Sequence, residues 1–127
     1  MIVSIVEDDP VVLELLTELL KMHGHDPHPI LIESGDTVDS GLARMAENHP
    51  DVVVMDVGMP VSGLVLLRAA QEDKRFAKVR YLVASAWFDS AENPPPVGPA
   101  VKTIAKPYEV PELLAAIAGE DRRPNRA

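Results

Sequence analysis

Short apolar runs alternate with amphipathic segments along the chain. The apolar runs predict β-strands at residues 2–6, 27–32, 51–55, 79–84 and 102–105. Between them, apolar residues recur at helical spacing and predict helices at residues 11–22, 36–48, 64–72 and 108–118. Strands that alternate with helices are typical of an α/β fold, in which a mainly parallel sheet is covered by helices on both faces.

Prolines refine this prediction. Pro27 and Pro29 each lack the backbone donor that a central strand needs, so their strand is expected at an edge of the sheet. That position fits a flavodoxin-like, doubly wound five-stranded parallel sheet of order 2-1-3-4-5. The run Pro94-Pro95-Pro96 lies where the helix after the fourth strand is expected, so this fourth helix is predicted to be short or missing.

Composition limits the domain count and the kinds of partner. The chain has 127 residues, of which 46% are hydrophobic, enough for one domain. We expect this domain at residues 1–119 and a flexible tail at residues 120–127. Asp and Glu outnumber Lys and Arg by 20 to 12, and this excess argues against direct binding to nucleic acid or to anionic membranes.

The same sequence excludes several kinds of chemistry. There is no cysteine, which removes disulfides, thiolate zinc sites and cysteine nucleophiles. No apolar run is long enough to span a bilayer, and the first residues lack the basic and apolar regions of a signal peptide. We therefore expect a cytoplasmic protein.

Acidic residues gather at the predicted carboxyl ends of the first and third strands. They are Glu7, Asp8, Asp9 and Asp56. Carboxylates held together repel one another unless protons or a hard cation offset their charge, and Mg²⁺ prefers such oxygen ligands. Ser85 and Lys106 follow the next two strands and offer the hydroxyl and ammonium donors that a phosphoryl group needs.

In order and spacing, these residues resemble the receiver domain of two-component response regulators, over nearly the whole chain. Glu7-Asp8 resembles the opening acidic pair, and the segment from Asp56 to Pro60 resembles the phosphorylation segment. Ser85-Ala86 is similar to the switch hydroxyl and its small neighbour. Lys106-Pro107-Tyr108 is similar to the Lys-Pro-aromatic motif.

The resemblance implies a role for each of these residues. Asp56 would accept a phosphoryl group, and Asp8 would bind Mg²⁺ directly, together with Glu7, Asp56 and the Gly58 carbonyl. Ser85 would act as the switch hydroxyl, and Lys106 would pair with the phosphoryl group or with Asp56. The protein would then be a signalling phosphoacceptor that catalyses only its own phosphorylation and dephosphorylation, not an enzyme with a separate substrate.

The implied phosphoryl donor is a histidine kinase or a phosphotransfer protein. The sequence contains no output domain, so the implied target of the signal is another protein.

The sequence departs from the family at several positions. Thr103 stands where many receivers have a switch aromatic, so readout would need another element, such as Trp87, Tyr108 or the proline-rich loop. Gly63 lies one residue nearer to Asp56 than the family's loop glycine usually does, and this loop is expected to be shortened.

Three other functions are alternatives to this one. A phosphorylation-independent interaction module is compatible with the altered region around the proline run. A metal-dependent phosphohydrolase would commonly have a second acid two residues after the nucleophile, where this chain has Gly58. Nucleotide or flavin binding would need a glycine- or hydroxyl-rich first loop, and Glu7-Asp8-Asp9 would repel a phosphate there.

Two groups of residues have simpler interpretations. Asp9, which precedes Pro10, is predicted to cap the first helix rather than to bind metal. The histidines are predicted to be surface residues, since they lie far in sequence from the acidic residues. They are His23, His25, His28 and His49.

Overall fold

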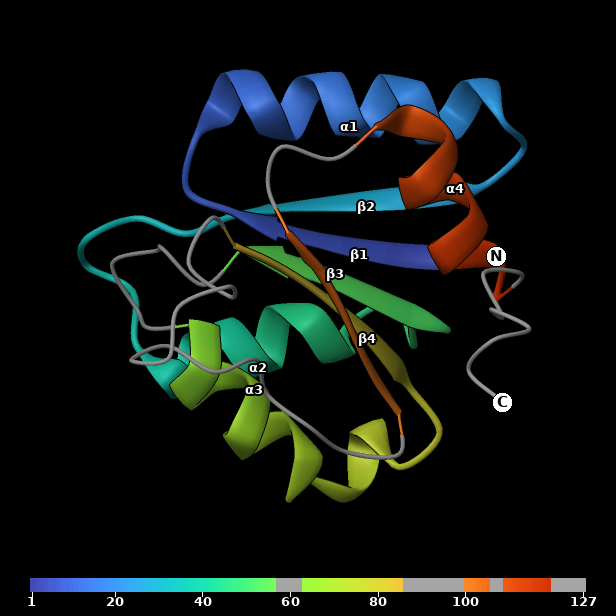
Figure 1. Ribbon diagram of the computed structural model, residues 1–127. Coiled ribbons are helices and arrows are strands. Elements are labelled where there is room, and N and C mark those ends of the chain that lie inside the picture. Colours follow the sequence, from blue (N-terminus) through green and yellow to red (C-terminus); the bar gives the residue numbers. More distant parts are fainter. Residues whose placement is uncertain (57–62, 86–99, 106–108, 120–127) are drawn as a thin grey trace.

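The computed structural model describes residues 1–56, 63–85, 100–105 and 109–119. They form one parallel sheet of five strands in the order β2-β1-β3-β4-β5 (Figure 1), which confirms the predicted fold class. The strands are β1 (Ile2–Glu7), β2 (Asp26–Leu31), β3 (Val52–Asp56), β4 (Arg80–Ser85) and β5 (Val101–Ala105). The helices are α1 (Pro10–Met22), α2 (Val38–Ala46), α3 (Gly63–Gln71), α4 (Val110–Ala118) and a short 3-10 helix, Lys74–Phe76.

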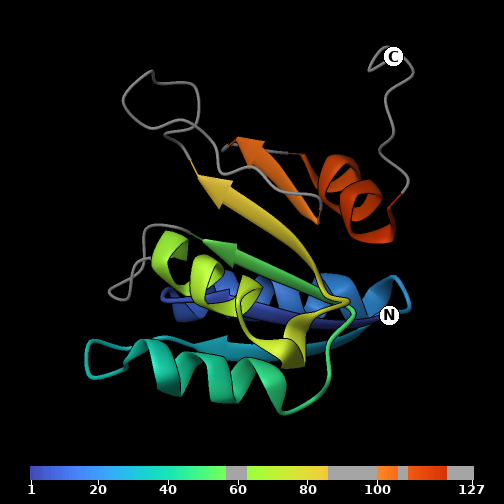
Figure 2. The same cartoon turned by 90° about the horizontal axis from the view of Figure 1, so that it is seen from below.

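Helices cover both faces of the sheet. Figures 1 and 2 show α1 and α4 on one face and α2 and α3 on the other. Alternate strand residues point to opposite faces, so Val3 and Ile5 pack in the cluster beneath α1 and α4, while Val6 packs beneath α2 and α3. Both clusters consist of hydrophobic residues, and they hold the carboxyl ends of the central strands at one edge of the molecule.

The turn from β1 into α1 forms as the sequence predicts. The Asp9 carboxylate accepts hydrogen bonds from the amides of Val11 and Val12, at 2.9 and 3.4 Å, and Pro10 is the first helical residue. After α1, Gly24 has a φ of 84°, a left-handed conformation that favours glycine. The prediction that Asp9 is a helix cap is confirmed.

Helix α2 begins later than predicted because its cap is Thr37. The Thr37 hydroxyl accepts a hydrogen bond from the Ser40 amide, and the Ser40 hydroxyl accepts one from the Thr37 amide. This reciprocal pair fixes the first turn, so Asp36 lies before the helix rather than in it. The predicted short or missing helix between β4 and β5 falls on residues 86–99, and the predicted tail on residues 120–127, both outside the described residues.

Strand β2 lies at the edge of the sheet, as predicted, but its prolines do not cost the ladder a hydrogen bond. The Asp26 amide donates a hydrogen bond to the Met1 carbonyl, just before β1, and the Ile32 amide donates one to the Glu7 carbonyl, at the end of β1. Both bonds are 2.9 Å long. Amides of alternate residues point to the same side of a strand, so positions 27 and 29 face away from β1. Pro27 and Pro29 therefore stand where a donor would face outward, which protects the edge from pairing with another strand.

Because of this arrangement, the loss of stability caused by a proline in β2 depends on whether the amide at that position points toward β1 or away from it. Pro29→Thr is expected to change the free energy of unfolding by less than about 1 kcal/mol, because no ladder donor is gained or lost. His28→Pro is expected to cost about 3 kcal/mol, because the amide of residue 28 faces β1. Urea unfolding of both variants measures the difference. Equal costs would show that the assigned phase is wrong.

Candidate functional site

The carboxyl ends of β1 and β3 bring the predicted acidic residues to one place. Val6 pairs with Met55 in the parallel ladder, so the next residues, Glu7 and Asp56, leave the two strands at the same level. Asp8 follows Glu7 directly and belongs to the loop before α1. The acidic cluster, as we call Glu7, Asp8 and Asp56, therefore lies at the edge where sites form in doubly wound sheets.

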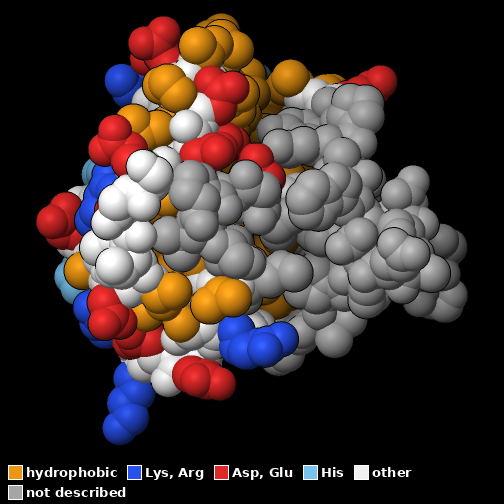
Figure 3. Space-filling view, turned by 90° about the vertical axis from the view of Figure 1, so that its left-hand side faces the viewer, with side chains coloured by type: hydrophobic (Ala, Val, Ile, Leu, Met, Phe, Trp, Pro, Cys, Tyr) orange, Lys and Arg blue, Asp and Glu red, His pale blue; other side chains and the backbone are white. Residues whose placement is uncertain are grey.

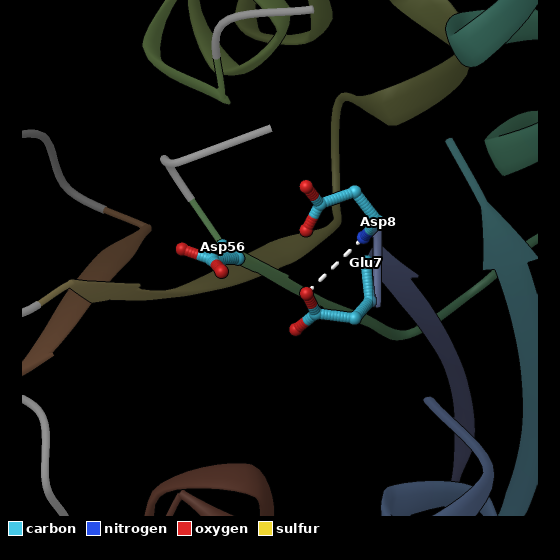
Figure 4. A group of neighbouring side chains, drawn as sticks. All are labelled: Glu7, Asp8 and Asp56. Carbon is cyan, nitrogen blue, oxygen red and sulfur yellow. Dashed lines mark hydrogen bonds between the residues drawn. The ribbon is translucent and has the colours of Figure 1, made fainter. Parts of the chain in front are cut away.

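The carboxylates of the acidic cluster point toward one another (Figure 4). One oxygen from each of Glu7, Asp8 and Asp56 lies within 4.8 Å of the other two. Glu7 is buried, whereas Asp8 and Asp56 are partly exposed. A group of hard oxygen ligands at this spacing suits Mg²⁺ or another hard divalent cation, and the partial exposure leaves room for the waters that Mg²⁺ keeps.

Glu7 is the most perturbed carboxylic acid of the cluster. Its Oε1 accepts hydrogen bonds from the amides of Asp8 and Asp9, at 3.1 and 3.3 Å, and these contacts favour the charged form. Burial, a hydrogen bond with the Asp8 side chain and the negative charge of Asp56 outweigh them and raise the pKa of Glu7 to about 7. Without a cation, Glu7 is therefore partly protonated near neutral pH.

A small cavity lies beside the buried Glu7 side chain. It has a volume of about 10 Å³, enough for about one water, and it lies between the acidic cluster and α1. Apart from the two carboxylic acids, Glu7 and Asp56, its lining is apolar. The other lining residues are Ile5, Val6, Leu16, Val54, Met55 and Ala84. The inner side of Glu7 thus faces hydrocarbon, which disfavours its charged form.

The stability of the metal-free protein should depend on pH through Glu7. In the folded protein the pKa of Glu7 is about 7, above its ordinary value of 4.5, so the folded state holds this proton over a range in which the unfolded chain releases it. Stability is therefore lost as pH rises from about 4.5 to about 7. Glu7→Gln keeps the hydrogen-bond acceptor and removes the charge, so it should stabilise the protein at pH 8 by up to about 3 kcal/mol.

Urea unfolding in EDTA at pH 5 and pH 8 measures this effect. The gain from Glu7→Gln should be much smaller at pH 5, where the folded parent is already protonated at this residue. A gain that is the same at both pH values would contradict a raised pKa.

The structure describes only some of the other residues that the sequence predicts for the site or its readout. Strand β4 ends at Ser85, one residue beyond Ala84, the ladder partner of Asp56, so the backbone of Ser85 reaches the same edge. Thr103 lies in β5, half-buried and paired with Val83. Four residues predicted for the site or for readout lie outside the described residues. They are Gly58, Lys106, Trp87 and Tyr108.

The histidines do not join the acidic cluster. His23 lies near the Leu19 carbonyl, and His28 pairs with Asp26 at 3.2 Å, at the start of β2. In the described part of the chain, the acidic cluster is the one group of three or more potential metal-ligating side chains. None of the described helices has both the length and the apolarity that crossing a membrane would need.

Comparison with known proteins agrees with the fold. The family model of the response regulator receiver domain matches residues 3–118. The polar-differentiation response regulator DivK from Brucella ovis is 30% identical over 118 residues, which cover 91% of this chain and 91% of DivK. The DNA-binding transcriptional regulator RpaA from Synechocystis is 26% identical over 134 residues, which cover 98% of this chain and 50% of RpaA.

Solved structures show the same architecture. The receiver domain of the sensor histidine kinase PA1611 from Pseudomonas aeruginosa has a TM-score of 0.76 and 20% identity, and the match covers 93% of this chain and 94% of that domain. That structure is described with a magnesium ion coordinated in its active-site cleft.

The five-stranded fold with an acidic cluster at its carboxyl edge is the architecture of two-component receiver domains. The chain belongs to the response regulator receiver domain family. Receiver domains are signalling domains that interact with histidine kinases and downstream targets.

Proposed function

We propose that this protein is a phosphoacceptor in two-component signal transduction and that Asp56 receives the phosphoryl group. The observation that supports this most strongly is the position of Asp56 at the end of β3, with its carboxylate within 4.8 Å of oxygens from Glu7 and Asp8. Asp56 is partly exposed, so a donor can reach it, and the neighbouring acids can hold a cation beside it.

The donor set fits Mg²⁺. Asp8 and Asp56 would bind the ion, with Glu7 nearby and the Gly58 carbonyl as a further oxygen ligand. Bound Mg²⁺ neutralises charge on phosphoryl oxygens and so lowers the repulsion that an anionic nucleophile meets. Burial and the neighbouring acids raise the pKa of Glu7, and a bound cation would favour its charged form.

The transfer itself uses the Asp56 carboxylate as the nucleophile. One of its oxygens attacks the phosphorus of a phosphohistidine in a histidine kinase or a phosphotransfer protein, and the bond between phosphorus and the imidazole nitrogen breaks. Ser85 and Lys106 are the residues proposed to donate hydrogen bonds to the phosphoryl oxygens. The protein would promote only its own phosphorylation and dephosphorylation, and the phosphorylated form would change its binding to a downstream protein.

Intact-mass spectrometry after incubation with acetyl phosphate tests this proposal. A phosphoryl adduct is expected with Mg²⁺ and should be absent with EDTA. A beryllofluoride complex, formed in parallel, detects a competent site whose phosphoryl group is too short-lived to observe. Failure to form either species, with Mg²⁺ binding shown separately, would support a phosphorylation-independent interaction module instead.

A further inference from the structure

The acidic cluster has an apolar inner side as well as an open outer side. Glu7 follows Ile5 by two residues, and Asp56 follows Val54 by two, so all four side chains point to the face of the sheet that α1 covers. Figure 3 shows the carboxyl edge from outside, with Asp and Glu side chains near the centre of the view and hydrophobic side chains above them, where α1 lies. The two sides of the Asp56 carboxylate therefore meet different surroundings.

Leu16 closes the inner side of the cluster. Of the described residues that line the cavity beside Glu7 and Asp56, Leu16 is the one that comes from a helix, and the others belong to β1, β3 and β4. Leu16 is half-buried and packs against the same core as Ile5 and Val54. With its side chain in place, the cavity has a volume of about 10 Å³, room for about one water. Leu16 thus limits how much water reaches the inner side of Asp56.

Hydration of Asp56 matters most when a phosphoryl group leaves it. In hydrolysis, a water oxygen attacks the phosphorus, the bond between phosphorus and the Asp56 oxygen breaks, and its electron pair stays on the carboxylate. The attacking water gives a proton to solvent, and inorganic phosphate departs. The carboxylate regains its charge in this step, and apolar surroundings disfavour that charge unless water or another donor bonds to it. The hydrophobic shell around a site controls how much water has access.

We propose that Leu16 is a positioning residue that prolongs the phosphorylated state of Asp56, because it keeps water from the inner side of the departing carboxylate. Leu16 has no polar group in its side chain, so it acts only through Asp56 and the water beside it. The proposal rests on the phosphoacceptor function proposed above. It deepens that function by naming a residue that sets the lifetime of the phosphoryl group.

Truncation of Leu16 tests the proposal. Leu16→Ala leaves room for further water, and the two carboxylic acids that line the cavity can bind it, whereas a wholly apolar cavity would stay dry. Protein phosphorylated with acetyl phosphate is separated from the donor by rapid desalting into buffer with Mg²⁺, and intact-mass spectra follow the loss of the adduct. Leu16→Ala should lose its phosphoryl group roughly fivefold to tenfold faster than the parent.

Two variants separate this effect from a general loss of packing. Leu19→Ala makes the same truncation three residues further along α1, at a residue that is also half-buried against this core but does not line the cavity. Leu16→Met nearly keeps the volume of the side chain and should restore the slow decay. Both variants should lose the phosphoryl group within about twofold of the parent rate. Calorimetry should give all three variants the Mg²⁺ affinity of the parent within about twofold, since no oxygen ligand changes.

Hydrolysis in water labelled with oxygen-18 shows which bond breaks. The label should enter the released phosphate, as attack on phosphorus requires, and the peptide that contains Asp56 should stay unlabelled. Label in Asp56 of the Leu16→Ala variant would mean that water attacks the carboxyl carbon, and this result would overturn the proposed mechanism.

Other results would overturn the role of Leu16 itself. They are equal decay rates for Leu16→Ala and the parent, an equal acceleration by Leu19→Ala, and a large loss of Mg²⁺ affinity in Leu16→Ala, which would show a disturbed cation site. All of these are comparisons between proteins that carry the adduct. A parent protein that forms no adduct contradicts the phosphoacceptor function instead, so the two failures are distinguishable.

Discussion

An Asp56→Asn variant is expected to form no phosphoryl adduct with acetyl phosphate while it stays folded. The substitution keeps the size and shape of the side chain but replaces the carboxylate nucleophile with a neutral amide, which does not attack phosphorus at a useful rate. Removing one charge from the acidic cluster also lessens the repulsion around Glu7, so the folded state should not be destabilised. Intact-mass spectra and thermal unfolding of the variant measure the two effects.

Asp51→Asn is the matched control for this variant. Asp51 immediately precedes the same strand, at the opposite end of β3 from Asp56, and its carboxylate accepts a hydrogen bond from the Ile2 amide at 2.8 Å. Asparagine keeps an acceptor there, and the residue is far along β3 from the acidic cluster. This control should accept a phosphoryl group like the parent. A full adduct on Asp56→Asn would show that another residue is the acceptor.

An Asp8→Asn variant is expected to bind Mg²⁺ at least tenfold more weakly than the parent. It removes a full negative charge from a site in which the oxygens of three acids lie within 4.8 Å of one another. A charge interaction over about 4 Å is worth on the order of 4 kcal/mol in the partly screened environment near a protein surface, more than the 1.4 kcal/mol that corresponds to a factor of ten. Calorimetric titration with Mg²⁺ measures the loss.

The neighbouring residue provides the control for Asp8. Asp9→Asn removes the same charge one residue further along, and asparagine caps helices as well as aspartate does. The Asp9 carboxylate is engaged by the amides of Val11 and Val12, so its loss should change Mg²⁺ affinity only a few-fold. Equal losses for the two variants would mean that the general field of the acidic loop, and not a ligand at position 8, attracts the cation.

Most of the fold could be predicted from local patterns. The apolar run of β3 ends at Asp56, and the Asp9-Pro10 pair begins α1, so the sequence places both sides of the site before any tertiary contact is known. Pro27 and Pro29 correctly predict an edge strand. Whether the prolines replace amides that point toward β1 or away from it depends on the register of β2 against β1. That register is known only from the three-dimensional structure.

The electrostatics of the site could not be predicted in the same way. Glu7, Asp8 and Asp9 are adjacent and chemically alike, and the sequence does not say that Glu7 is the buried one. That follows from the alternation of side chains along β1 and from the packing of Leu16 near the cavity beneath the cluster. The start of α2 is a similar case, because Asp36 and Thr37 are both good caps and the side-chain bonds to Ser40 decide between them. The roles of Gly58 and Lys106 stay predictions.

The most direct test of the proposed phosphoacceptor is to locate the phosphoryl group by borohydride reduction. Sodium borohydride converts an aspartyl phosphate to homoserine, and peptide sequencing by mass spectrometry then identifies the modified position. After incubation with acetyl phosphate and Mg²⁺, homoserine should be found at position 56 alone. Homoserine at position 8 or at another acidic residue, with Asp56 unchanged, would contradict the assignment of Asp56 as the phosphoryl acceptor.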